Sequence, residues 1–145
     1  MRLASWRIYE SYTGPLGAGT LTDILGSHYG PGIESSGRKA IECLGQAQRC
    51  EATFRFDRPA GWYDLDVEYF DQNNGESRFR LFVGNQKVDE WIANDHLPAT
   101  KPGGDSSTRR RVTGLALRPG DQIHIEGSPD GGERAPVDYV EIRAK

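Results

Sequence analysis

The sequence predicts an all-β fold in which short antiparallel strands form a sandwich or a barrel. The 145 residues include 18 glycines and only 36% hydrophobic residues, a balance that favours turn-rich β structure over a helical bundle. After Gly37, several short segments alternate apolar and polar residues, which is typical of strands with one buried face. Turn residues separate these segments at near-regular intervals. A chain of this length fits a single domain with a proper core.

The clearest predicted strand is 62–70, where Tyr63, Leu65, Val67 and Tyr69 share one face and carboxylates share the other. Turns rich in glycine, asparagine and proline lie between this segment and its neighbours. The complete set of predicted strands is 50–56, 62–70, 77–83, 87–91, 111–117, 122–126 and 137–143.

The first 37 residues show little periodicity. Clusters of glycine and proline at 13–19 and 26–32 predict loop structure. The one regular candidate is 3–12, whose apolar residues fit a strand or a helix equally well. We therefore expect an N-terminal fragment, 1–37, with a long Gly-rich loop, followed by a β module, 38–145.

Charge and apolar content exclude two classes of partner. The net charge of −3 and the pI of about 5.6 give no basic face of the kind that binds nucleic acid. No segment approaches the ~20 apolar residues of a membrane span. No apolar signal core is seen near Met1, so no secretion signal is expected, and the cellular location is left open.

The two cysteines and three histidines give little indication of a metal-binding site. Cys43 and Cys50 can form a disulfide across a hairpin or remain free thiols. The histidines, His28, His96 and His124, show no zinc-ligand spacing with these cysteines.

Three phrases carry a family resemblance: GWYDLDVEYFD at 61–71, PGDQIHIEG at 119–127 and VDYVEI at 137–142. In this order they resemble phrases of carbohydrate-binding modules of families six and thirty-five. Those modules are jelly-roll β-sandwiches, so the resemblance implies a jelly roll over about 39–145.

Other phrases resemble a specific enzyme family. DQNNGESRFRLFV at 71–83, VDEWIANDHLP at 88–98 and PDGGERAPVDY at 129–139 look like the C-terminal β module of family sixty-seven α-glucuronidases. SWRIYESYTGPLGAGTLTDI at 5–24 and GSHYGPG at 26–32 look like a passage after the catalytic barrel of that family. The resemblance implies an enzyme gene that has lost its barrel and a large internal piece, with the join near 33–39. Whether such a deletion is natural or engineered is left open.

The missing piece would include the usual first strand of the module. The segment 7–11 resembles that strand, so we expect residues of about 5–12, helical in the parent enzymes, to become the first strand here. An unpaired sheet edge would drive the change, since tertiary context overrides helix propensity. The long following loop allows either a monomer or a strand-swapped dimer.

The resembling modules hold a structural calcium near the first and last strands, which implies Glu10 and Asp138 as ligands here. Calcium takes six to eight oxygens, and one family glutamate has no counterpart in this chain. The alternative is that Asp138 caps a loop and Glu10 is solvated. The run Asp71–Gly75 opens like an EF-hand loop but has Phe82 at the twelfth position, so a turn is expected.

Sugar binding needs an exposed aromatic ring with polar groups around it. Trp91, Asn94 and His96 form the expected site, and Tyr29 could reach the same rim. The alternative is that Trp91 covers the sandwich. Trp62 and Tyr63 are expected to pack in the core or at an edge, while the cations that a uronic acid needs could come from the arginines at 109–111.

The resemblance implies no catalytic residue in this chain, since the family's catalytic carboxylates lie in the barrel. Asp130 and Glu133 lie in a Gly-rich turn and are not expected to act as an acid pair. The sequence therefore predicts a non-catalytic module that binds xylan-derived or uronic-acid-containing sugars weakly. The alternative is a structural module without a ligand.

Overall fold

The computed structural model describes residues 2–4, 20–21, 43 and 48–145. All regular structure in this part of the chain is β-strand. None of the described segments forms a helix that could cross a membrane. The strands are β1 (Arg2–Ala4), β2 (Thr20–Leu21), β3 (Cys50–Arg55), β4 (Gly61–Phe70), β5 (Arg78–Val83), β6 (Gln86–Ile92), β7 (Ser107–Leu117), β8 (Gln122–Ser128) and β9 (Val137–Ala144).

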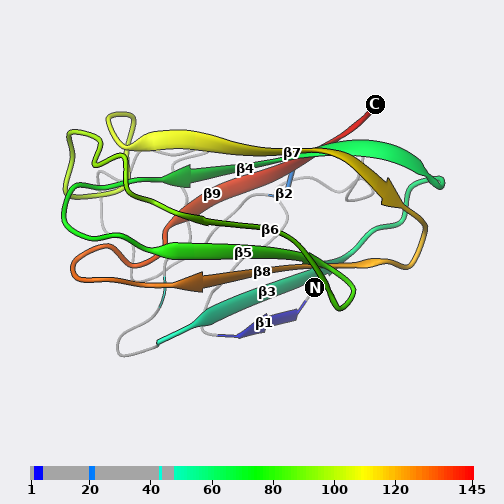
Figure 1. Cartoon of the computed structure of the whole chain (residues 1–145), viewed down its shortest axis with the longest axis horizontal. Helices are drawn as coiled ribbons and strands as arrows, with labels where there is room; N and C mark the ends of the chain where they lie inside the picture. The colour runs from blue at the N-terminus through cyan, green and yellow to red at the C-terminus, as the bar shows by residue number, and fades with distance from the viewer. Residues whose placement is uncertain (1, 5–19, 22–42, 44–47) are drawn as a thin grey trace.

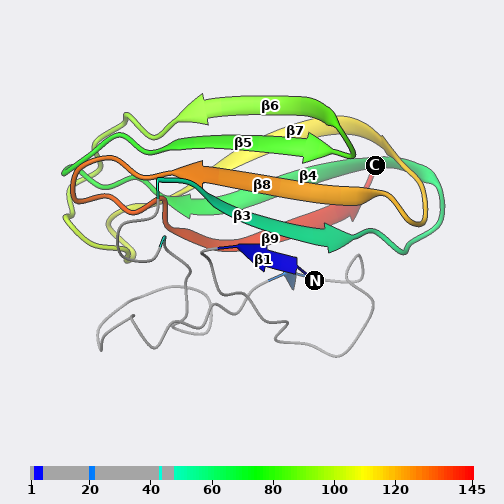
Figure 2. The same cartoon turned by 90° about the horizontal axis from the view of Figure 1, so that it is seen from below.

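Two antiparallel sheets face each other (Figures 1 and 2). The five-stranded sheet has the order β1-β3-β8-β5-β6, and the four-stranded sheet has the order β2-β9-β4-β7. Neighbours in each sheet are often far apart in sequence, as where β3 pairs with β8 and β4 pairs with β9. The predicted all-β jelly-roll sandwich is confirmed.

The core lies between the sheets and follows the predicted alternation. Tyr63, Leu65, Val67 and Tyr69 of β4 are all buried. They meet inward-facing residues of the opposite sheet, including Phe79, Leu81, Trp91, Ile123 and Ile125. Burial of these large apolar side chains is the main favourable term for a sandwich of this size.

Strand β7 begins earlier than the sequence predicts. Its first four residues, Ser107 to Arg110, pair with the end of β4 although they are all polar. Glu68 of β4 accepts hydrogen bonds from Ser107 and Arg109. Because these residues are polar, apolar alternation could not reveal the extension.

Two short N-terminal strands complete the sheets. β1 pairs with β3, and β2 pairs with β9. β2 falls inside the stretch that was predicted to be loop, and it covers an otherwise unpaired edge of β9. The whole of the predicted first strand, 5–12, lies outside the described residues, so that strand and the 1–37 and 38–145 boundaries stay predictions. Cys43 is disulfide-bonded.

Candidate functional site

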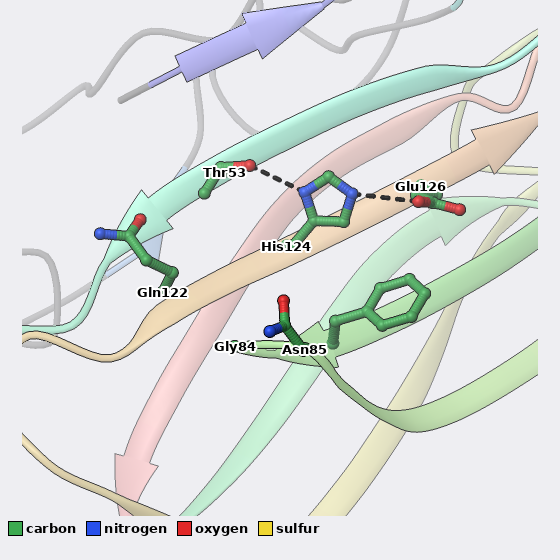
Figure 3. A pocket seen from close by; sticks show the side chains of 7 residues that line it. Thr53, Gly84, Asn85, Gln122, His124 and Glu126 are labelled. Atoms are coloured by element: carbon green, nitrogen blue, oxygen red, sulfur yellow. Dashed lines mark hydrogen bonds and ion pairs between the residues drawn. The ribbon is translucent and has the colours of Figure 1, made fainter.

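The outer face of the five-stranded sheet carries a row of three side chains, Thr53, His124 and Phe82. They lie directly opposite one another on β3, β8 and β5 because the strand registers align them. An open pocket of about 310 Å³ lies over this row (Figure 3). Its lining residues are Thr53, Phe82, Gly84, Asn85, Gln122, His124 and Glu126.

His124 is held on both sides of its ring. Its Nδ1 lies 2.7 Å from Thr53 Oγ1, and its Nε2 lies 3.2 Å from Glu126 Oε2 (Figure 3). The centroids of the Phe82 and His124 rings are 5.5 Å apart, with the ring planes tilted by 58°. The pocket thus combines a half-buried aromatic ring with fixed polar groups, while the amides of Asn85 and Gln122 are exposed at its rim.

A charged row lies next to this pocket. Glu51, Glu126 and Arg80 are directly opposite one another on β3, β8 and β5. Arg80 Nε is 2.8 Å from Glu90 Oε2, whereas its Nη1 is 3.8 Å from Glu126 Oε1. A second open hollow is lined by Gln48, Arg49, Glu51, Arg80 and Ser128. Polar groups therefore continue across the sheet face from one hollow to the next.

Trp91 does not offer a sugar platform. The side chain is only 6% exposed, and its ring stacks on Phe79 at a centroid distance of 5.4 Å. On another side the Arg110 guanidinium carbon lies 5.4 Å from the Trp91 ring centroid. The expectation of an exposed ring was wrong because the alternation of β6 turns Trp91 inward, opposite Phe79. The alternative, that this ring covers the sandwich, describes the structure.

The Arg110 contact yields a stability prediction. Asp89 holds Arg110 through two hydrogen bonds of 2.7 and 2.9 Å. Replacing Asp89 with alanine should remove about 1 kcal/mol of stability and lower Tm by about 3 °C in a thermal melt. The control is Glu76→Ala, which breaks the exposed pair with His96 and should cost less than about 0.5 kcal/mol. Equal losses in both variants would contradict this account.

Asn94 and His96 are exposed on the loop after β6. His96 has a φ of 51°, and its backbone N–H donates to the buried Asp71. Its Nε2 lies 2.8 Å from Glu76 Oε2, and this hydrogen bond raises the pKa of His96. Neither Asn94 nor His96 lines the pocket over His124, so a sugar contact by these residues stays a prediction.

The remaining expected ligands are only partly described. Tyr29 and Glu10 lie outside the described residues, so the Tyr29 rim and the Glu10–Asp138 calcium site stay predictions. Asp138 is the second residue of β9 and is 4% exposed.

The arginines expected to bind a uronic acid are instead engaged in ion pairs. Arg110 is bonded to Asp89. Arg109, Arg111 and Arg143 surround Asp66, with their nitrogens 3.6, 2.9 and 2.9 Å from its carboxylate oxygens. Burial acts to raise the pKa of Asp66, but hydrogen bonds from Arg111 and Arg143 outweigh it and hold this pKa below its ordinary value.

Asp130 and Glu133 hold loops together. The fully buried Glu133 carboxylate accepts backbone N–H groups of Gln72 and Ser77 at 2.5 and 2.7 Å. Asp130 accepts the N–H of Glu76 at 2.8 Å. Burial raises the pKa of Glu133 to about 7. Through these contacts the two carboxylates join the loops after β4 and β8.

Trp62 is the exposed aromatic ring that sequence reasoning missed. Its side chain is 63% exposed on the four-stranded sheet, opposite Ala116 of β7. The expectation that Trp62 packs in the core or at an edge was wrong, whereas Tyr63 is buried as expected. The alternation of β4 could have placed Trp62 outward, since Tyr63 and Leu65 define the inner face.

Relatives and solved structures resemble this chain over most of its length. The sequence model of the glycosyl hydrolase family 67 C-terminus matches residues 1–69. The probable α-glucuronidase A of Aspergillus oryzae is 35% identical over 73% of this chain and 13% of that protein. That of Aspergillus niger is 33% identical over 93% of this chain and 16% of that protein. The chain thus spans about one seventh of these relatives.

Two solved structures share the fold. A GH26-CBM35 β-(1,4)-mannanase from Podospora anserina has a TM-score of 0.55 and 16% identity, over 98% of this chain and 28% of that chain. A family 35 carbohydrate-binding module from Clostridium thermocellum has a TM-score of 0.50 and 14% identity, over 98% of this chain and all of that one. These likenesses confirm the carbohydrate-binding-module type of sandwich.

The similarity to the Aspergillus niger protein also bears on the expected internal deletion. It runs over 141 residues and includes 93% of this chain, which leaves room for only a few gap positions. A long segment missing near 33–39 is therefore not borne out by this relative. The similarity covers both the N-terminal fragment and the β module, and this chain is related to the C-terminal region of family 67 α-glucuronidases.

Proposed function

We propose that this chain is a non-catalytic carbohydrate-binding module that takes xylan-derived or glucuronic-acid-containing oligosaccharides in the pocket over His124. The observation that carries the proposal is the make-up of this pocket. An apolar ring, Phe82, lies beside an imidazole fixed by hydrogen bonds, with two amides at the rim. A pyranose needs this combination, since its apolar face packs on a ring while its hydroxyls need donors and acceptors.

The electrostatics of the pocket suit a neutral or weakly acidic sugar. Glu126 offers an acceptor, and the nearby Arg80 is the cation of the charged row. Because Arg80 is already paired with Glu90, it offers only partial compensation to a uronic acid carboxylate. The pocket is open, so a bound sugar keeps much of its contact with water. We expect millimolar affinity, or about −4 kcal/mol.

The proposed binding is tested by titrating the ¹⁵N-labelled chain with glucuronoxylan oligosaccharides up to ~10 mM, where a millimolar site is mostly filled. The amide signals of Thr53, Gln122 and His124 should shift in a saturable manner. Replacing Phe82 with alanine should weaken binding at least about tenfold, since the packing surface for the sugar is lost. Trp62→Ala is the matched aromatic control and should bind like the original chain.

Two results would contradict this assignment. Shifts that gather around Trp62 and vanish in Trp62→Ala would move the sugar to the four-stranded sheet. No shift at all would favour a structural module that serves the rest of an α-glucuronidase. One observation speaks against a large docking face on the described part of the chain: its two exposed large apolar side chains, Trp62 and Ile92, lie in different sheets.

The proposal also includes a structural calcium ion, and Asp138 is its one expected side-chain ligand among the described residues. Its buried carboxylate near the start of β9 suits a structural ion that also uses Glu10 and backbone carbonyls. Such an ion would stabilise the fold, and the proposed sugar pocket does not depend on it.

A further inference from the structure

The outer face of the five-stranded sheet places two carboxylates opposite each other. Glu51 and Glu126 are direct cross-strand partners on β3 and β8. Like charges in this position destabilise a sheet unless something compensates them. His124 lies two residues before Glu126 on the same face. One ligand atom of each of these three side chains lies within 4.8 Å of the other two.

We propose that Glu51, His124 and Glu126 bind a divalent transition-metal ion of the zinc type. Three protein ligands with an open fourth position are a common zinc arrangement, in which water or an external ligand completes the coordination. The open pocket beside His124 and Glu126 supplies room for that fourth ligand. A cation between the carboxylates would also remove the repulsion across the strands.

The hydroxyl of Thr53 orients the His124 imidazole for metal binding. Thr53 is the direct cross-strand partner of His124, and its Oγ1 lies 2.7 Å from Nδ1 (Figure 3). When Nδ1 carries the proton and donates to this hydroxyl, Nε2 is left as the ligand atom. Nε2 is the nitrogen that faces Glu126, at 3.2 Å from Oε2. A hydrogen bond to the second ring nitrogen is a usual feature of metal-binding histidines.

The types of ligand atom at this site indicate which metal it would bind. Calcium takes six to eight oxygens and has little use for an imidazole. Zinc takes both imidazole nitrogens and carboxylate oxygens as ligands. This site is therefore distinct from the calcium site expected at Glu10 and Asp138. All three ligands stand on two directly paired strands, so the backbone fixes their spacing before the metal arrives.

Neighbouring arginines limit the affinity. Arg49 lies 3.0 Å from Glu51 and must give up part of that contact to a metal. Arg80 makes its short contact with Glu90, at 2.8 Å, and only a 3.8 Å contact with Glu126. Glu126 therefore keeps an oxygen for the ion. We expect a dissociation constant of about 1 µM, or about −8 kcal/mol.

The test uses the full chain, stripped of metal by a chelator and kept without reductant so that the disulfide stays closed. Calorimetric titration with Zn²⁺ should give one site per chain. Co²⁺ should give visible absorption bands typical of four-coordinate cobalt. Ca²⁺ at the same concentrations should not displace the cobalt. The proposed sugar binding is not needed for any of these results.

Four variants locate the ion. His124→Ala and Glu126→Gln should each weaken Zn²⁺ binding at least about 50-fold, since a direct ligand is lost. Thr53→Val should weaken it about 10- to 100-fold, the usual effect of losing an outer partner. His96→Ala is the matched control, because His96 also pairs with a glutamate, at 2.8 Å, but lies on the loop after β6 and not on β8. Thermal melts show which variants are folded.

The proposal is overturned by any of three outcomes. The first is no stoichiometric Zn²⁺ binding below ~1 mM. The second is unchanged binding in folded Glu126→Gln or Thr53→Val, which settles the matter even if His124→Ala fails to fold. The third is loss of binding in His96→Ala, which would place the ion at Glu76 and His96.

Discussion

Replacing Gly75 with alanine is expected to cost at least about 3 kcal/mol, because the new methyl group has no space. A Cβ on Gly75 would lie 1.9 Å from the backbone carbonyl oxygen of Asp130 and 3.0 Å from the Cβ of Glu133. A backbone atom cannot rotate away as a side chain can. The loops after β4 and β8 would have to separate, and chemical denaturation should show a lower midpoint.

Gly61→Ala is the matched control for this substitution. A Cβ there would meet only the Tyr63 ring, at the ordinary contact distance of 3.6 Å. Its effect should stay within about 0.5 kcal/mol, as for most surface changes. A Gly75→Ala variant as stable as Gly61→Ala would show that these two loops are not in close contact in solution.

Replacing Glu133 with alanine is expected to cost about 2–5 kcal/mol. The change leaves the buried N–H groups of Gln72 and Ser77 without their acceptor, and each such loss costs about 1–3 kcal/mol. Asp130→Ala is the control, since Asp130 is exposed and accepts one hydrogen bond, from Glu76. Denaturation midpoints should separate the two variants clearly, and similar midpoints would argue against a buried role for Glu133.

The same carboxyl group should make stability depend on pH. Burial raises the pKa of Glu133 to about 7 from 4.5, so the folded chain binds this proton more tightly than the unfolded chain. Its contribution is fully present below about pH 4.5 and is lost as the pH rises to 7, with a change on the order of 3 kcal/mol. Burial also raises the pKa of Asp71, which faces the same loops. The stabilising contribution of Asp71 is therefore likewise lost as the pH rises.

His96, which lies near Asp71, also makes the folded chain less stable as the pH rises. The pKa of His96 is raised by its hydrogen bond to Glu76, so its stabilising charge is lost as the pH rises. The pKa of Asp66 is lowered, and its contribution is instead lost in acid. We expect the original chain to be more stable at pH 5 than at pH 7.5. Glu133→Gln should flatten this difference, and an unchanged slope in that variant would assign the effect to other groups.

Alternation made most of the fold predictable. Seven strands were expected from residue 50 onward, and β3 to β9 lie in those places. The inner face of β4 was assigned correctly because apolar residues occur at every second position. The start of β7 escaped prediction because Ser107, Arg109 and Arg110 bond carboxylates of other strands. No pattern in the local sequence indicates such contacts between distant strands.

The candidate site was less predictable because it depends on strand register. Trp91 was expected to be exposed since its sequence neighbours are polar, yet β6 turns it inward against Phe79. His124 showed no zinc spacing in the sequence, because its proposed co-ligand Glu51 lies far away along the chain. Only the pairing of β3 with β8 brings them together. Asp66 likewise lies in an outward position but is buried beneath arginines from two other strands.

The order of strands in the two sheets has a consequence for synthesis of the chain. Of the described strands in the first 70 residues, only β1 and β3 pair with each other. β2 and β4 both pair with β9, β4 also pairs with β7, and β3 also pairs with β8. At about 5–20 residues per second, the ribosome needs roughly 4–15 s to make the missing partners. A nascent chain that ends near residue 70 therefore contains the sequences of four strands but has nearly no sheet, and the sandwich can close only when β9 has been made.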